Sequence, residues 1–98
     1  MAPRDGEVDP VGAADLHLRA SIDRALGRPA EALAAYRASL DREPLELTWR
    51  YELADLLYEQ SRYEEAFQEL LKIRLQQPEN DRARALIDAV KAKIAEGR

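Results

Sequence analysis

The sequence predicts an all-α fold of five helices joined by short turns. Apolar residues recur at helical spacing along most of the chain of 98 residues, and no stretch alternates between apolar and polar with a period of two. Proline and glycine interrupt the pattern at short intervals. The charged fraction of 35% beside an apolar fraction of 46% is typical of amphipathic helices with solvated outer faces.

Helix-breaking residues indicate where the first two helices begin and end. Asp9 and Pro10 favour a helix start, because the carboxylate can accept from a free backbone N–H and proline needs no donor at the first helical position. Gly27 is expected to end this helix and Pro29 to begin the second. The residues ahead of the first helix, 1–8, are expected to form a flexible tail.

Residues of the same kinds indicate where the next two helices begin and end. A third helix is predicted between Pro44 and Gln60, where apolar residues recur at helical spacing. Ser61 and Glu64 then read as a capping box for a fourth helix. In such a box the hydroxyl accepts an N–H three residues on and the carboxylate reaches back. Pro78 is expected to end the fourth helix.

A fifth helix completes the predicted set. Asn80 is expected to cap its start, and Gly97 follows its end. Its apolar side carries Leu86, Ile87, Val90 and Ile94. Arginine and lysine occupy the other side, which suits a polar-faced helix that closes a stack.

The residue inventory excludes several function classes. The formal net charge of −4 argues against nucleic acid or an anionic membrane as the main partner. The chain has no cysteine, hence no disulfide, thiolate metal site or cysteine nucleophile, and its single histidine, His17, rules out a multi-histidine metal site. No glycine-rich phosphate loop, His-Glu zinc motif or Ser-His-Asp set is present. We therefore expect no catalytic activity, no cofactor and no bound metal.

Targeting signals are also missing from the sequence. No apolar run approaches the roughly 18–20 residues that span a bilayer. The N-terminal residues lack the apolar segment of a secretory signal, so we expect a cytoplasmic protein. The alanine-rich composition, with more arginine than lysine, is typical of a GC-rich bacterial source.

An internal repeat relates the helices to one another. Shifting the sequence by 34 residues places Gly27 on Ser61, Ala20 on Ala54, Ala32 on Ala66, Tyr36 on Leu70 and Pro44 on Pro78. In this alignment each turn residue, small residue, large residue and proline is matched with a residue of the same type. A fixed period of this length with two helices per unit predicts a solenoid.

This register resembles the tetratricopeptide repeat. That family has a small residue late in the first helix, a turn residue, an aromatic residue just after the turn, an alanine early in the second helix, a bulky residue four later and a closing proline. The second unit supplies Ala54, Ser61, Tyr63, Ala66, Leu70 and Pro78 in these places, and the first supplies Ala20, Gly27, Pro29, Ala32, Tyr36 and Pro44. The resemblance implies a right-handed superhelical stack of antiparallel helix hairpins, with repeats at 13–46 and 47–80, a capping helix at 81–96 and one domain over 9–98.

Two departures from the family pattern stand out. Arg19 and Asp23 in the first unit, and Arg50 in the second, occupy places where the family prefers large apolar residues. The first helix instead offers a second apolar stripe that contains Leu18, Ile22 and Leu26. We expect this stripe to mediate self-association or docking onto a neighbouring domain.

The resemblance implies a binding groove lined by the first helix of each hairpin, for a peptide or a helix. By register, the groove residues are His17, Ser21 and Arg24 from the first helix, Thr48, Tyr51, Glu52, Asp55, Tyr58 and Glu59 from the third, and Arg82, Ala85 and Ala89 from the fifth. A known specialised groove of the family clamps a carboxylate with lysine and asparagine. The residues here are of other types, so we expect no such clamp.

The expected partner is a protein segment that is basic or mixed polar and apolar. Tyr51, Asp55 and Tyr58 share one stripe of the third helix, and aromatic faces beside carboxylates suit such a segment. The stretch 41–69 holds nine acidic and three basic residues, a net of −6, whereas 81–98 has a net of +2. This gradient can steer a partner along the groove.

Other interpretations stay open at this point. Charged helix faces are usually just solvated, and tyrosines on a helix are as often half-buried packing residues. The first hypothesis is an interaction scaffold or adaptor. The alternatives are a structural module for homo-oligomerisation, and an accessory domain of a larger protein whose catalytic part lies elsewhere.

Overall fold

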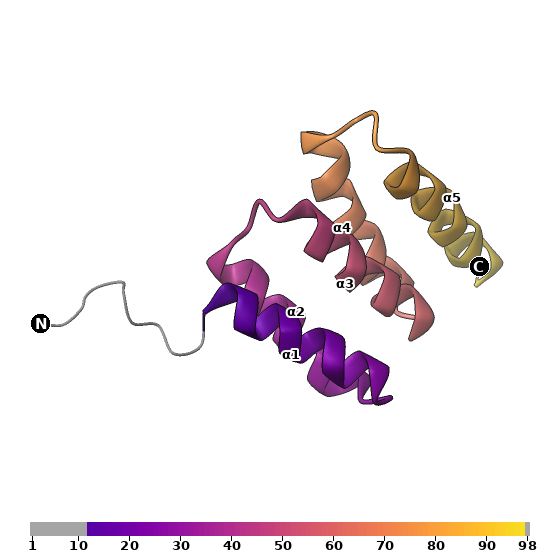
Figure 1. Ribbon diagram of the computed structural model, residues 1–98. Helices are drawn as coiled ribbons and strands as arrows, with labels where there is room; N and C mark the ends of the chain where they lie inside the picture. The colour runs from indigo at the N-terminus through magenta and orange to yellow at the C-terminus, as the bar shows by residue number, and fades with distance from the viewer. Residues whose placement is uncertain (1–11, 98) are drawn as a thin grey trace, which may run out of the picture. The chain divides into compact units, whose positions relative to one another are not determined.

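The computed structural model describes residues 12–97, which fold into five helices without a strand. The helices are α1 (Ala13–Ala25), α2 (Pro29–Arg42), α3 (Leu47–Glu59), α4 (Tyr63–Gln76) and α5 (Asp81–Glu96), as Figure 1 shows. The all-α prediction is thus confirmed for this part of the chain. The predicted tail and the helix start at Asp9 and Pro10 lie outside the described residues, whereas α1 begins at Ala13 after Gly12.

The chain divides between Pro44 and Leu45 into two compact units. The first unit contains α1 and α2, and the second contains α3, α4 and α5. Within residues 12–97, no helix has the length and apolar character needed to cross a bilayer.

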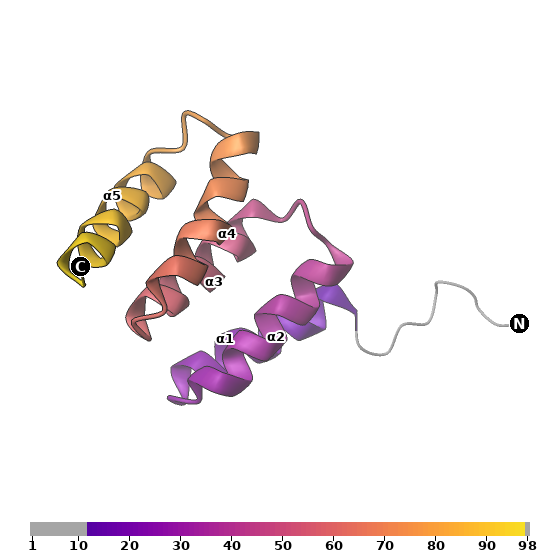
Figure 2. The ribbon, with the colours of Figure 1, turned by 180° about the vertical axis from the view of Figure 1, so that it is seen from behind.

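The first unit is a helix hairpin in which α1 and α2 lie side by side (Figures 1 and 2). Pro29 occupies the first position of α2, as expected. Ala20 and Ala32 are fully buried, in keeping with small residues where two helices pack closely. Tyr36 is 1% exposed and fills the space beside them.

The turn of this hairpin depends on a left-handed glycine. Gly27 has φ +73°, and the N–H of Arg28 donates to the carbonyl of Asp23 at 2.8 Å. The N–H of Gly27 donates to the carbonyl of Arg24 at 3.1 Å. These two bonds form a Schellman motif, which satisfies the last carbonyls of α1. The prediction that Gly27 ends the first helix is confirmed.

The turn between α3 and α4 repeats this motif with a serine in place of the glycine. Ser61 has φ +63°, and the N–H of Arg62 donates to the carbonyl of Leu57 at 2.8 Å. The predicted capping box is therefore wrong. Ser61 belongs to the end of α3, and the N-cap of α4 is Arg62, which makes no side-chain cap hydrogen bond.

The second unit adds α5 to the α3–α4 hairpin. Figure 2 shows α5 alongside α4, and α5 also contacts α3. Asn80 caps α5 as predicted, because its Oδ1 accepts from the N–H of Ala83 at 3.0 Å. The core of this unit includes Leu53, Leu57, Leu70, Ile73 and Val90, all at most 1% exposed.

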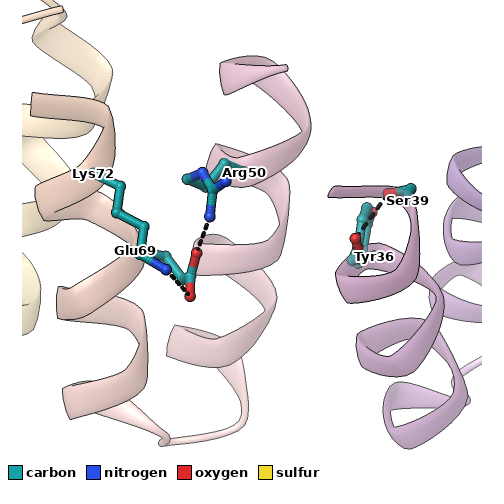
Figure 3. A network of polar contacts seen from close by, with 5 residues as sticks. All are labelled: Tyr36, Ser39, Arg50, Glu69 and Lys72. Atoms are coloured by element: carbon teal, nitrogen blue, oxygen red, sulfur yellow. Dashed lines mark hydrogen bonds and ion pairs between the residues drawn. The ribbon is translucent and has the colours of Figure 1, made fainter. Parts of the chain in front are cut away.

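A buried ion pair explains one departure from the repeat pattern. Arg50 of α3 donates through Nη1 to Oε1 of Glu69 in α4 at 2.6 Å, and their side chains are 11% and 10% exposed. Lys72 Nζ lies 3.5 Å from Glu69 Oε2, so the carboxylate sits between two cations (Figure 3). The arginine at this apolar position thus joins the two helices of the hairpin by a charge-assisted bond.

A second polar contact in Figure 3 lies in the first unit. The hydroxyl of Ser39, which is fully buried, donates to the carbonyl of Tyr36 one turn earlier at 2.7 Å. The bond satisfies a polar group in the core at little cost to the helix.

Candidate functional site

The clearest part of the predicted groove lies in the second unit, where α5 meets α3. The guanidinium carbon of Arg82 lies 4.4 Å from the centroid of the Tyr51 ring. This distance is well within the range of a cation–π contact. Tyr51 is half-buried and Arg82 is exposed, so the ring and its cation lie at the surface. The structure thus brings these two predicted residues together.

The second tyrosine of the predicted stripe has a packing role as well. The ring of Tyr58 lies 5.6 Å from the ring of Tyr63, with their planes inclined by 60°. The hydroxyl of Tyr63 donates to Oγ of Ser61 at 3.3 Å. Tyr58 therefore stabilises the turn into α4, in line with the interpretation that face tyrosines are often packing residues.

Acidic and polar side chains occupy the rest of this face of α3. Glu52 and Asp55 are half-buried, whereas Glu59 and Thr48 are exposed. On α5, Ala85 is exposed and leaves room beside Arg82. We call the set Tyr51, Glu52, Asp55, Tyr58 and Arg82 the α3–α5 face. It combines aromatic surface, carboxylates and one cation, a combination that suits recognition of a peptide.

The first unit holds the other three predicted groove residues on α1. His17 is half-buried, and its ring lies 5.9 Å from that of Tyr36 at an inclination of 57°. The hydroxyl of Ser21 donates to the carbonyl of His17 at 3.2 Å. Arg24 is half-buried. In this unit, the histidine and the serine are both engaged within the hairpin.

A hollow between α4 and α5 was not anticipated from the sequence. It has a volume of ≈ 480 Å³ and is lined mainly by apolar atoms of Phe67, Ile94 and Ala95, with Glu64, Gln68 and Lys91 around them. The only sequence signal was the apolar stripe of each helix. Periodicity assigns Phe67 and Ile94 to the inner face of each helix without showing that the two helices leave a gap there.

The sequence profile of the tetratricopeptide repeat matches residues 17–80, about two thirds of the chain. The chain belongs to the tetratricopeptide repeat family. The matched residues run from within α1 to Asn80, the N-cap of α5. Tetratricopeptide repeats are protein-interaction modules, so this chain is an interaction module in that general sense. A search of curated proteins gives no match.

Membership in the tetratricopeptide repeat family does not assign a role to single residues. The twelve predicted groove residues are distributed over both units, nine of them in the second. Of these nine, Tyr51 and Arg82 contact each other. The groove role of these residues stays a prediction in both units.

Proposed function

We propose that the chain is a non-catalytic adaptor that binds a peptide or a helix of a partner protein on the α3–α5 face. The observation that supports this most is the Tyr51 ring, which lies half-buried at the surface beside half-buried carboxylates. Aromatic side chains with one exposed surface are the usual anchors of protein interfaces. The buried residues of α3 are Leu53, Ala54, Leu56 and Leu57, so Tyr51 and the two carboxylates are not part of the core.

The chemistry of this face favours a basic or mixed basic and apolar segment. The contact between Arg82 and Tyr51 shows that the ring accepts a guanidinium from one side. Glu52 and Asp55 add negative charge within the stretch 41–69, whose net charge is −6. A partner arginine that approaches Tyr51 would gain from the same carboxylates. We expect no cofactor and no nucleic acid in this role.

Self-association is the second candidate function. The observation that favours it is the exposure of Leu18, Ile22 and Leu26 on α1, which are 58%, 50% and 59% exposed. The hypothesis of an accessory domain in a larger protein stays open beside it, since a docking partner would cover the same stripe.

A peptide selection with three matched baits tests the adaptor function. The wild-type chain, Tyr51→Ala with Asp55→Ala, and Phe67→Ala with Glu64→Ala are used to select from one random peptide library. The last variant removes a half-buried aromatic residue and a carboxylate from the α4–α5 hollow, so it matches the first in kind. Circular dichroism checks that all three baits have the same helicity.

The expected result is enrichment of peptides with arginine or lysine beside apolar residues. We expect wild type and the hollow variant to bind these peptides, and the α3–α5 variant to lose them. Selection that survives in the α3–α5 variant but fails in the hollow variant would move the binding site to the hollow. No enrichment by any bait would count against an adaptor.

A further inference from the structure

Two hollows lie next to each other between α4 and α5. Beside the hollow of ≈ 480 Å³, a smaller one of ≈ 250 Å³ lies near the turn that joins the two helices. Lys91 lines both hollows, so they are neighbours along α5. We call them together the α4–α5 cleft, which extends over about three turns of α5, from Arg84 to Ala95. The smaller hollow is lined by Arg74, Pro78, Arg84, Ile87, Asp88 and Lys91.

The α5 side of the cleft corresponds to the side of α3 that packs on α4. The residues that α5 supplies to the smaller hollow follow four residues of α3 by one repeat period of 34. In α3 these residues are Arg50, Leu53, Ala54 and Leu57, and in α5 they are Arg84, Ile87, Asp88 and Lys91. The three apolar residues of α3 are at most 1% exposed. On α5, Asp88 and Lys91 are exposed, so no helix of the second unit covers this side as α4 covers α3.

The bond between Arg50 and Glu69 shows what a covering helix supplies at this register. Arg50 of α3 donates to the Glu69 carboxylate of α4, and its side chain is 11% exposed. Arg84 has the equivalent place on α5 and is 60% exposed, with a contact of 3.7 Å to Asp81 of the same helix. A helix that lies on α5 as α4 lies on α3 would set a side chain beside Arg84. A carboxylate there forms a charge-assisted bond.

The other charges of the cleft also favour an acidic occupant. The smaller hollow is lined by three cations and one carboxylate, a net charge of +2. A helix with a purely apolar face would bury these charges without a partner, which is costly. A helix with carboxylates on that face pairs with Arg84 and Lys91 instead. Charge complementarity thus selects an acidic segment here, and a basic one on the α3–α5 face.

The larger hollow adds an apolar subsite next to the cations. Phe67 and Ile94 line it and are both half-buried. Its volume of ≈ 480 Å³ is large enough for the side chain of a leucine or a phenylalanine, the kind of anchor that fills a pocket in an interface. Lys91 lies between this subsite and Arg84, so a helix of about three turns reaches all of them.

We propose that the α4–α5 cleft binds an amphipathic helix of a partner protein whose face carries both acidic residues and a large apolar residue. A carboxylate of this helix pairs with Arg84 as Glu69 pairs with Arg50, and the apolar side chain packs on Phe67 and Ile94. The chain then has two binding surfaces with opposite charge preference. The proposal is independent of the α3–α5 face, because none of the residues of that face lines the cleft.

A selection from a library of single helices tests the proposal. The helices are displayed on phage, have about four turns and are randomised on one face. The baits are wild type, the cleft variant Arg84→Gln with Lys91→Gln, and the control Arg19→Gln with Arg28→Gln. The control removes two exposed cations of the first unit that do not line the cleft, so both variants change the net charge equally. Circular dichroism checks that helicity is unchanged.

We expect wild type and the control to enrich helices that carry glutamate or aspartate beside a large apolar residue. The cleft variant should lose them. A double-mutant cycle then tests the pairing with Arg84, using one selected helix and its Glu→Gln form in fluorescence anisotropy titrations. Arg84→Gln should weaken binding of the acidic helix about fivefold and that of the Gln form less than about twofold.

Four results would overturn the proposal. These are enrichment of no helix by wild type, enrichment of helices without acidic residues, equal enrichment by the cleft variant, and equal effects of Arg84→Gln on both helices of the cycle. A wild-type dimer in sedimentation velocity that Arg84→Gln dissociates would assign the cleft to a second copy, and would also overturn it. Tyr51→Ala with Asp55→Ala should keep the acidic helices while losing the basic peptides, so the two surfaces are measured separately.

Discussion

Ser61 and Gly27 occupy the same place in the turns of two successive hairpins, and only glycine suits the backbone conformation there. Both have positive φ, at +63° and +73°, and both precede the residue whose N–H closes a Schellman motif. A residue with a Cβ loses roughly 1–2 kcal/mol in this conformation, whereas glycine adopts it without strain. A β-carbon at Gly27 would meet no heavy atom within 4 Å, so the penalty there is conformational and not steric.

Exchanging these two residues should change stability in opposite directions. We expect Ser61→Gly to raise the free energy of unfolding by about 0.5–1 kcal/mol and Gly27→Ser to lower it by a similar amount. Urea unfolding followed by circular dichroism measures both. Ser61→Ala is the control, because it loses the hydroxyl contact with Tyr63 but keeps the strain. A Ser61→Ala variant that is as stable as Ser61→Gly would show that strain at this turn is negligible.

The pair of Arg50 and Glu69 should be costly to break from one side. We expect Glu69→Ala to lower the free energy of unfolding by about 3 kcal/mol, because the guanidinium of Arg50 stays largely buried beside the lost carboxylate. Replacing both residues by leucine should recover most of this loss. The measurement is again urea unfolding of each variant.

An exposed pair in the same unit provides the control for this prediction. Arg62 Nε lies 2.8 Å from Glu65 Oε2, with the side chains 46% and 47% exposed. Glu65→Ala should therefore cost less than about 1 kcal/mol. Equal losses at Glu65 and Glu69 would contradict the distinction between a buried pair and a solvated one.

At the scale of helices, the same register position has two different environments. Leu18 of α1 and Leu86 of α5 are both leucines two repeat periods apart, but they are 58% and 8% exposed. We expect Leu86→Ala to lower the free energy of unfolding by about 2–3 kcal/mol and Leu18→Ala by about 0.5 kcal/mol or less. Unfolding at low micromolar concentration keeps self-association out of the comparison. A loss at Leu18 as large as that at Leu86 would mean that α1 is covered within one chain.

The sequence predicts a helix boundary correctly where the residue type there has only one usual role at a helix end. Pro29 begins α2, Asn80 caps α5 and Gly27 ends α1, each through a backbone property that the residue carries by itself. Ser61 has two possible roles, because serine can cap the start of a helix or lie just after the end of one. The backbone hydrogen bonds of the turn decide between the two, and these depend on a positive φ that the sequence does not show.

Contacts between helices were predictable only in part. The repeat register placed Tyr51 and Arg82 in one groove, but it did not show that they contact each other. The bond from Arg50 to Glu69 joins residues 19 positions apart on two helices. Periodicity assigns each residue to a side of its own helix, so it cannot pair polar side chains across two helices.

At the scale of the whole molecule, the acidic charge should control how fast a partner binds. If the partner segment is basic, raising the salt from about 0.1 M to about 1 M shortens the screening length from about 10 Å to about 3 Å. We expect the association rate of a selected peptide to fall by roughly tenfold or more, with a smaller change in its dissociation rate. Stopped-flow fluorescence measures both rates. An association rate that does not depend on salt would contradict electrostatic steering by the 41–69 stretch.

A titration followed by amide NMR tests whether the α3–α5 face binds the partner. A peptide from the selection is added to the ¹⁵N-labelled chain, and the shift of each backbone amide is recorded. We predict that the largest shifts fall on α3 around Tyr51 and Asp55 and on the start of α5 around Arg82. Shifts confined to the outer residues of α4, or to Leu18, Ile22 and Leu26, would contradict binding at the α3–α5 face.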